Sequence, residues 1–273
     1  MAHEESPKVL EPEYYQRLHD LEETHWWSRG MRRAMFSLLE IPLAGRKHLR
    51  ILDVGCGTGY LLTVLDDLAA RDRTVGLDVS VHALGFCRQR GVTRVLAASA
   101  TELPLPDSSY DLVVCIDTIQ HLAPRGADSR ALSEFARVLA PGGILYLRTN
   151  SALGHRRLQG VDPNLYRRYR RKELCQLVAE VGLEVERSTY LNFIPSLWAA
   201  LKEVSDPSVG KVPVSGPTLT IMPPAPDSSW VDELKLSLLR CEALWLGSKR
   251  WNLPFGHSLA VVARRRQQKT RSP

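Results

Sequence analysis

The residues most able to do chemistry in this chain lie in the stretch Asp53-Val-Gly-Cys-Gly-Thr-Gly59. Gly55, Gly57 and Gly59 allow the backbone to turn sharply and to approach a ligand that any side chain would block. Asp53 places a carboxylate directly before the glycines, where it suits a ligand carrying an ammonium group better than one carrying a phosphate. The stretch therefore predicts a binding site for a ligand with a cationic end.

The spacing of the glycines separates this site from a dinucleotide site. A dinucleotide fingerprint reads G-x-G-x-x-G, and the helix that follows it faces a pyrophosphate. Here the spacing is G-x-G-x-G, and Tyr60 stands where the third glycine of that fingerprint would be. Together with Asp53, this spacing favours S-adenosylmethionine, which has an amino-acid tail and no phosphate.

A second carboxylate is expected to join this site. Residues 74–77 form a predicted strand that ends at Asp78. A carboxylate at that strand end can accept hydrogen bonds from both ribose hydroxyls of a nucleoside. The alternative, a charge at the start of the helix capped by Ser80, fits the strand-end position less well. Asp78 and its neighbour Val79 are therefore assigned to the cofactor site.

The elements that must position these groups follow an α/β pattern. The apolar residues of 51–54 predict a buried parallel strand, and the residues after Thr58 change to helical spacing. Strand, glycine turn and helix form a nucleotide-binding corner at the carboxyl edge of a sheet. Further strands are predicted at 94–97, 112–116, 144–147, 184–190 and 258–263. The predicted fold is a Rossmann-like, doubly wound, seven-stranded sheet that is mostly parallel and flanked by helices.

These motifs resemble the class I S-adenosylmethionine-dependent methyltransferases. The first motif of that family is acidic-x-Gly-x-Gly-x-Gly, and residues 98–111 are similar to its Gly-Asp-Ala-x-x-Leu-Pro-Phe-x-x-x-x-Phe-Asp segment. The resemblance implies S-adenosylmethionine as the cofactor, an antiparallel last strand, and adenine contacts at Ser99 and Ala100. Ser99 departs from the family pattern, because an aspartate usually stands there.

The segment His25-Trp-Trp-Ser-Arg29 resembles the start of a bacterial subset of these enzymes, in which the leading helices close over the cofactor. Two adjacent tryptophans cannot both point into one core from a helix, so one is expected to line a cleft. The alternative is that Trp26 and Trp27 both pack the helices onto the domain. The resemblance assigns Trp27 and Arg29 to the cofactor site.

Candidate catalytic groups follow the later strands. Asp117 ends the strand at 112–116 and is expected near the sulfonium, with His121 near the acceptor. Tyr169 and His155 are further acceptor-site candidates, although Tyr169 equally fits a core position. A base is needed only if the acceptor is a hydroxyl or a carbon acid, and no metal-binding motif is present in the sequence.

We expect one domain with additions. Residues 1–45 are expected to form a helical cap, 46–191 the cofactor-binding core, 192–256 a helical and proline-rich insertion, and 257–273 the last strand and a basic tail. The insertion is expected to build the acceptor pocket or a homodimer surface. Its helix, expected from Val231 to Leu246, would face the domain through Leu234, Leu238, Leu239 and Cys241 or Ala243.

Composition limits the partners. The chain has 273 residues, a net charge of +6 and five cysteines without metal-ligand spacing. With no apolar run of membrane length and no signal peptide, the expected compartment is the cytoplasm. The predicted function is methyl transfer to a small-molecule, lipid or sugar acceptor in biosynthesis. Two alternatives stay open: an RNA methyltransferase that uses the basic run Arg167–Lys172, and a cofactor-binding protein without catalysis.

Overall fold

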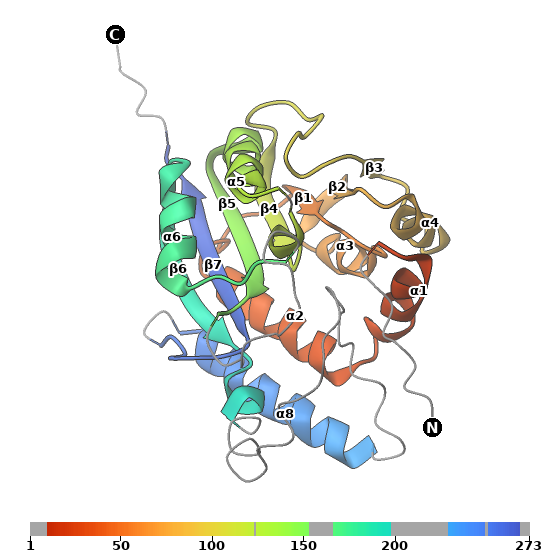
Figure 1. Ribbon diagram of the computed structural model, residues 1–273, viewed down its shortest axis with the longest axis vertical. Coiled ribbons are helices and arrows are strands. Elements are labelled where there is room, and N and C mark those ends of the chain that lie inside the picture. The colour runs from red at the N-terminus through yellow and green to blue at the C-terminus, as the bar shows by residue number, and fades with distance from the viewer. Residues whose placement is uncertain (1–9, 123, 153–165, 198–228, 249–250, 268–273) are drawn as a thin grey trace.

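The computed structural model describes residues 10–122, 124–152, 166–197, 229–248 and 251–267 (Figure 1). These residues form a seven-stranded sheet with the order β3-β2-β1-β4-β5-β7-β6. The strands are β1 Leu49–Val54, β2 Ala69–Asp78, β3 Val95–Ala97, β4 Tyr110–Ile116, β5 Leu139–Asn150, β6 Leu183–Leu191 and β7 Ser258–Arg265.

The direction of the strands confirms the predicted mixed sheet. β1 pairs in parallel with β2 and β4, and β4 pairs in parallel with β5. β7 is inserted between β5 and β6 and runs antiparallel to both. The central strands are apolar on both faces because helices cover both sides of the sheet, and Val113, Val114 and Tyr146 are fully buried.

The helices pack on both faces of the sheet (Figure 1). They are α1 Pro12–Leu21, α2 Trp26–Leu39, α3 Tyr60–Leu65, α4 Val81–Gln89, the short 3-10 helix η1 Ile119–His121, α5 Ala127–Val138, α6 Arg171–Glu180 and α8 Ser229–Leu246. The Ser80 hydroxyl accepts a hydrogen bond from the backbone of Ala83 at 3.3 Å, which caps α4 as expected. Gly91 follows α4 with a φ of +78°.

The N-terminal helices lie across the edge at which β1, β4 and β5 end (Figure 1). Tyr14 and Tyr15 of α1 pack on Ala83 of α4. α2 and α8 lie side by side although they are far apart in the sequence (Figure 1). Gly30 of α2 permits this approach, because a Cβ there would come within 2.7 Å of the Leu239 Cβ. The helix of the insertion therefore supports the helical cap.

The face that α8 buries differs from the predicted one. Leu239 and Ala243 are buried as expected, but Leu234, Leu238 and Cys241 are exposed. The helix carries two apolar stripes, and the buried one also contains Leu236, Glu242 and Leu246. Glu242 turns this stripe inward because its carboxylate accepts hydrogen bonds from the backbone of Asn192 (2.7 Å) and Phe193 (3.0 Å). A polar residue in the apolar pattern thus set the orientation of the helix.

No helix in the described ranges combines the length and the apolar composition that crossing a bilayer requires.

Candidate active site

A cavity of about 300 Å³ opens at the carboxyl edge of β1, β2 and β4, beneath α1 and α2. Aromatic and aliphatic side chains form most of its wall, and a few charged groups converge on it. An apolar pocket of this size with few polar groups is typical of a small-molecule site. Parallel strands bind ligands at this edge, as the sequence predicted.

The glycine turn forms the floor of the cavity. The backbone of Gly55 and Cys56 donates to the Leu77 carbonyl at 2.6 and 3.0 Å, which holds the turn against β2. Gly55, Gly57 and Gly59 have φ values of +77°, +54° and +84°, a region that favours glycine. Gly55 and Gly57 line the cavity, whereas Gly59 lies behind it at the start of α3.

Packing adds a second requirement for these glycines. A Cβ on Gly55 would overlap the Thr118 hydroxyl, which follows β4. A Cβ on Gly59 would lie 2.7 Å from the Cys87 sulfur on α4. The turn can therefore close only while both positions lack a side chain.

Asp53 and Asp78 face the cavity together. Asp53 is only 2% exposed, and burial, with help from Asp78 and Glu22, raises the pKa of its carboxyl to about 8. No cation or hydrogen-bond donor of the described chain lowers that pKa. Asp78 accepts hydrogen bonds from the backbone of Gly57 (3.0 Å) and Ser80 (2.9 Å), and burial raises its pKa as well. The cavity therefore favours a ligand that brings positive charge.

Glu22 is an acidic group of the cavity that the sequence reasoning missed. It follows α1 and accepts hydrogen bonds from the Thr58 hydroxyl and from Arg90 Nη2, the latter at 2.9 Å. Burial raises the pKa of Glu22 against the opposing effect of these two donors. The contact fastens α1 to the glycine turn. Nothing in the local sequence signals it, because Glu22 sits among other charged residues of a helix end.

Asp117 lies at the end of β4 and lines the cavity, as predicted, with a φ of +52°. Its carboxylate forms an ion pair with Arg148 at the end of β5, and the Arg148 Nε lies 3.3 Å from Asp117 Oδ1. Arg148 is only 6% exposed and was also missed. Its signal was present in the sequence, since a charged residue in an apolar strand at the ligand edge is unusual.

The two tryptophans separate as predicted. Trp26 packs on Leu236 and Leu239 of α8, whereas Trp27 lines the cavity. The Trp27 indole donates to Asn192 Oδ1 at 3.1 Å, and the Arg148 guanidinium lies 5.2 Å from its ring centre. These contacts fix the indole as one wall of the cavity.

Arg29 does not line this cavity. It lies two residues after Trp27 on α2, and its guanidinium nitrogen Nη1 lies 3.4 Å from the Glu233 carboxylate of α8 on the surface. The helical rotation between positions 27 and 29 turns the two side chains to different faces. The structure therefore does not bring Arg29 to the cofactor site to which it was assigned.

The predicted adenine contacts are only partly brought together. Ala100 lines the cavity, and so do Ala98 and Val79, of which Val79 was assigned to the cofactor site. Ser99 does not, because its hydroxyl is held in a local turn by the Thr101 backbone (3.2 Å) and the Thr101 hydroxyl (2.8 Å).

His121 lines the cavity, and burial lowers the pKa of its imidazole to about 4 against the opposing charge of Asp117. The ring is therefore neutral at pH 7. Its Nε2 lies 3.3 Å from Gln120 Nε2. The Gln120 carbonyl already accepts from Thr149 and Asn150, both at 2.9 Å. Gln120 must then donate to His121, which leaves the imidazole proton on Nδ1.

Tyr169 lies in the core and away from the cavity. It is fully buried, and its hydroxyl donates to Asp128 at 3.1 Å. The reason is that Tyr169 forms a β-bridge with Ser151, which draws its backbone into the sheet edge. The structure thus places Tyr169 at the core position that the sequence equally allowed, and does not bring it to the cavity. His155 lies outside the described residues.

The comparisons with known proteins agree with the fold and with the family that the sequence motifs resemble. Residues 52–147 match the family model described as a methyltransferase domain. A "Probable S-adenosylmethionine-dependent methyltransferase" of Mycolicibacterium smegmatis is 32% identical over 168 residues, which cover 60% of this chain and 62% of that protein. A "Probable tRNA methyltransferase 9B" of Homo sapiens is 35% identical over 97 residues, or 36% of this chain and 20% of that protein.

Solved structures share the fold at low sequence identity. The [4+2]-cyclase SpnF matches with a TM-score of 0.56 and 20% identity over 97% of this chain and 98% of its own. A methyltransferase in complex with the Haloferax volcanii Trm112 activator matches with a TM-score of 0.57 and 19% identity over 96% of this chain and 99% of that chain. These likenesses show the fold alone.

The sheet, the glycine turn and the acidic cavity define a nucleoside-binding α/β protein. The matched family model identifies residues 52–147 further as a methyltransferase domain, and relatives of the chain are named as probable S-adenosylmethionine-dependent methyltransferases. The cofactor of this family is S-adenosylmethionine, which confirms the predicted family, fold and cofactor. The chain spans about three fifths of the length of the mycobacterial relative, 62%.

Proposed function

We propose that the chain transfers a methyl group from S-adenosylmethionine to a small-molecule, lipid or sugar acceptor. One observation carries the proposal: a small, largely apolar cavity at the ligand edge contains the buried Asp53 carboxylate, which no described donor or cation neutralises. S-adenosylmethionine carries an ammonium and a sulfonium, and this positive charge complements the negative charge of the Asp53 carboxylate.

Residues at the ends of successive strands would contact successive parts of this cofactor. Asp53 would accept from the ammonium, and Asp78 retains free lone pairs for the ribose hydroxyls beside its two backbone donors. Val79 and Ala100 offer apolar surface to the adenine. Gly55 and Gly57 allow the close approach that this arrangement needs.

The bound cofactor supplies a methyl group on a sulfonium whose leaving group is a neutral thioether. The protein therefore needs to align donor and acceptor for an in-line displacement, which contributes about 7–11 kcal/mol at most. Trp27 and Tyr14 cover the cavity and exclude water from it. His121 is neutral and lines the cavity with its proton on Nδ1, so this N–H can position an acceptor oxygen, whereas the low pKa makes the ring a weak base.

Binding and turnover test the proposal separately. Calorimetric titration with S-adenosylmethionine and with its demethylated product is expected to give one site per chain. Release of the demethylated product is then measured across small alcohols, sugars, phenols and amines. A protein that binds a nicotinamide dinucleotide in preference to S-adenosylmethionine would contradict the proposal. Cofactor binding without turnover on any acceptor would instead support the alternative of a protein without catalysis.

RNA is a second candidate acceptor, favoured by two observations. Relatives named as probable tRNA methyltransferases match 97 residues, or 36%, of the chain. The basic run Arg167–Lys172 lies at the same sheet edge. Against RNA, Arg167 is already paired with Asp128 and Glu173, and Arg168 is half-buried. Transfer of labelled methyl groups to bulk tRNA, at low and high salt, distinguishes this candidate.

A homodimer in a reducing compartment completes the proposal. The second apolar stripe of α8 exposes Leu234, Leu238 and Trp245, and Trp251 packs on Trp245 at its end. Such a stripe is self-complementary under a two-fold axis and supports a second copy of this chain as the partner.

The five cysteines are all free, which supports a cytoplasmic location.

A further inference from the structure

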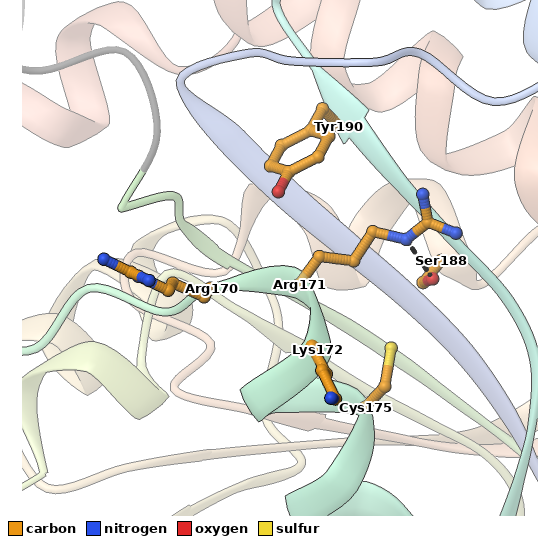
Figure 2. Close-up of a pocket in the computed structure, with 6 residues that line it drawn as sticks. All are labelled: Arg170, Arg171, Lys172, Cys175, Ser188 and Tyr190. Atoms are coloured by element: carbon orange, nitrogen blue, oxygen red, sulfur yellow. Dashed lines mark hydrogen bonds between the residues drawn. The ribbon is translucent and has the colours of Figure 1, made fainter.

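A second, basic cleft opens beside β6, the last strand in the sheet order, between the start of α6 and the end of β6 (Figure 2). Its volume is about 670 Å³. Arg170, Arg171 and Lys172 contribute its charge, and Ser188 and Tyr190 form the opposite wall. Figure 2 shows the Arg171 side chain reaching across to Ser188 and the Tyr190 hydroxyl pointing toward the start of α6.

No described carboxylate neutralises the positive charge of this cleft. Within the described residues, no carboxylate lies within 4.0 Å of the charged groups of Arg170, Arg171 or Lys172. The Arg171 Nε donates to the neutral Ser188 hydroxyl at 2.8 Å, which holds the guanidinium in place. By contrast, Arg137 is paired with both Asp107 and Glu134. Three unneutralised cations around one concave site favour an anion with several oxygens.

The groups of the cleft suit a phosphate. Two guanidinium groups present planar sets of donors that match phosphate oxygens, and an ammonium adds a compact charge. Tyr190, which is only 5% exposed, adds a hydroxyl on the opposite wall. No carboxylate of the described chain lines this cleft, so nothing in it would repel the anion.

The surroundings favour a compact anion over a long one. Among the exposed acidic residues of the same two elements, Glu173 lies next to the cleft and is paired with Arg167, and Glu180 and Glu184 lie at the far ends of α6 and β6. A polyanion that continued beyond the cleft would meet these carboxylates and be repelled. The positive charge is thus confined to the cleft itself, which has room for a phosphate group and the small molecule that carries it.

The cleft opens at the same sheet edge as the cofactor cavity. β5 and β6 both run antiparallel to β7, so their carboxyl ends point the same way. The segment from Tyr166 to Arg170 continues from that edge into α6, and Tyr166 lies against the ring of His121 at 5.2 Å. We propose that the basic cleft binds a phosphate ester group carried by a small acceptor, which rests on the methyl transfer proposed above.

Occupancy of the cleft can be read without any methyl transfer. Cys175 lines the cleft, whereas Cys241 is exposed on α8 and serves as an internal control. The full chain is alkylated with the uncharged reagent N-ethylmaleimide at constant ionic strength, and each cysteine peptide is followed by mass spectrometry. Inorganic phosphate and glucose 6-phosphate are expected to slow the reaction of Cys175 at least threefold and to leave Cys241 unchanged. Chloride and glucose are expected to have no effect.

Matched variants test the charges themselves. R170Q/K172Q removes two exposed cations from the cleft, and R88Q/R130Q removes two exposed cations elsewhere at the same cost in net charge. The Kd for glucose 6-phosphate is expected to rise at least tenfold in the first and to stay within twofold in the second. S-adenosylmethionine affinity is expected to be unchanged in both, so failure of either proposal is distinguishable from failure of the other.

Three outcomes would overturn the inference. They are equal effects of the two double variants on phosphate binding, equal protection of Cys175 and Cys241, and tight binding of a 20-nucleotide RNA that is lost in R170Q/K172Q and falls steeply with salt. The last result would assign the cleft to nucleic acid instead of to a small ester.

Discussion

Asp117 at the end of β4 is ion-paired with Arg148 at the end of β5, and together they close one side of the cofactor cavity. The pairing removes the negative charge that Asp117 would otherwise add beside Asp53 and Asp78. It also places the Arg148 guanidinium over the Trp27 ring, so one charged pair orders an aromatic wall. The cavity therefore keeps its unneutralised charge at the glycine turn, where the cofactor ammonium is expected.

Removing Arg148 is expected to destabilise the protein. In Arg148→Met the Asp117 carboxylate loses its partner, and the stacking on Trp27 is lost as well. The free energy of unfolding is expected to fall by about 1–3 kcal/mol, less than for a fully buried pair because Asp117 is 29% exposed. Urea unfolding measures this, and Asp117→Asn combined with Arg148→Met is expected to recover part of the loss. An unchanged unfolding midpoint would show that the pair contributes nothing.

Asp53 is expected to set the pH dependence of cofactor binding. Its pKa of about 8 means that the carboxyl is mostly protonated at pH 6, whereas the cofactor ammonium needs the carboxylate. Affinity for S-adenosylmethionine should then fall by up to about tenfold for each pH unit below 8, with release of a proton on binding. Calorimetry in buffers of different ionisation enthalpy measures that proton. Asp53→Asn should weaken binding by about 10- to 100-fold and remove the pH dependence.

Asp53 is also expected to make the free energy of unfolding depend on pH, in the direction opposite to that of cofactor affinity. Because the folded-state pKa of Asp53 is raised above its unfolded value, the ligand-free protein loses stability as the pH rises from about 4 through 8. Asp53→Asn removes that loss, so the variant is expected to be more stable than the wild type at pH 8 and to approach it at pH 5. Thermal unfolding across this range tests the sign. A variant less stable at pH 8 would mean that Asp53 has an internal partner.

The glycine turn and its two carboxylates could be predicted from the sequence because each is fixed locally. A positive φ demands glycine, and a residue that directly follows a parallel strand must lie at the ligand edge. The contacts of Arg148 and Glu22 could not be predicted in this way, since each depends on which elements become neighbours in the fold. The prediction of the buried face of α8 was wrong for a related reason. Its two apolar stripes are equivalent in the sequence, and only the hydrogen bonds of Glu242 decide which stripe is buried.

His121 is expected to matter chiefly for oxygen acceptors. With an alcohol or phenol acceptor, whose oxygen the Nδ1–H can position, His121→Phe is expected to lower kcat about tenfold, and with a neutral amine it should have little effect. Because burial lowers the pKa of His121 to about 4, the kcat profile should show no step near pH 6.5. Tyr169→Phe is the matched control, since Tyr169 lies in the core and should affect stability but not kcat.

The exposed stripe of α8 is expected to hold two copies of the chain together. Leu234→Glu with Leu238→Glu places two charges in the stripe without touching the buried face, so the dimer should dissociate while the fold is kept. Size-exclusion chromatography with light scattering gives the mass directly. Ile41→Glu, at an exposed apolar position outside α8, is the control. A wild-type protein that is monomeric at high micromolar concentration would contradict this assignment.

Gly55→Ala separates the two reasons for a glycine at the turn. The added methyl would overlap the Thr118 hydroxyl, and the φ of +77° would be strained by about 1–2 kcal/mol even in free space. In Gly55→Ala with Thr118→Ala the overlap is relieved and only the backbone strain stays. Affinity for S-adenosylmethionine is therefore expected to be lost in the single variant and partly restored in the double variant, to within about tenfold of Thr118→Ala alone. If the double variant binds no better than the single one, the backbone conformation alone decides, and contact with Thr118 has no part in shaping the site.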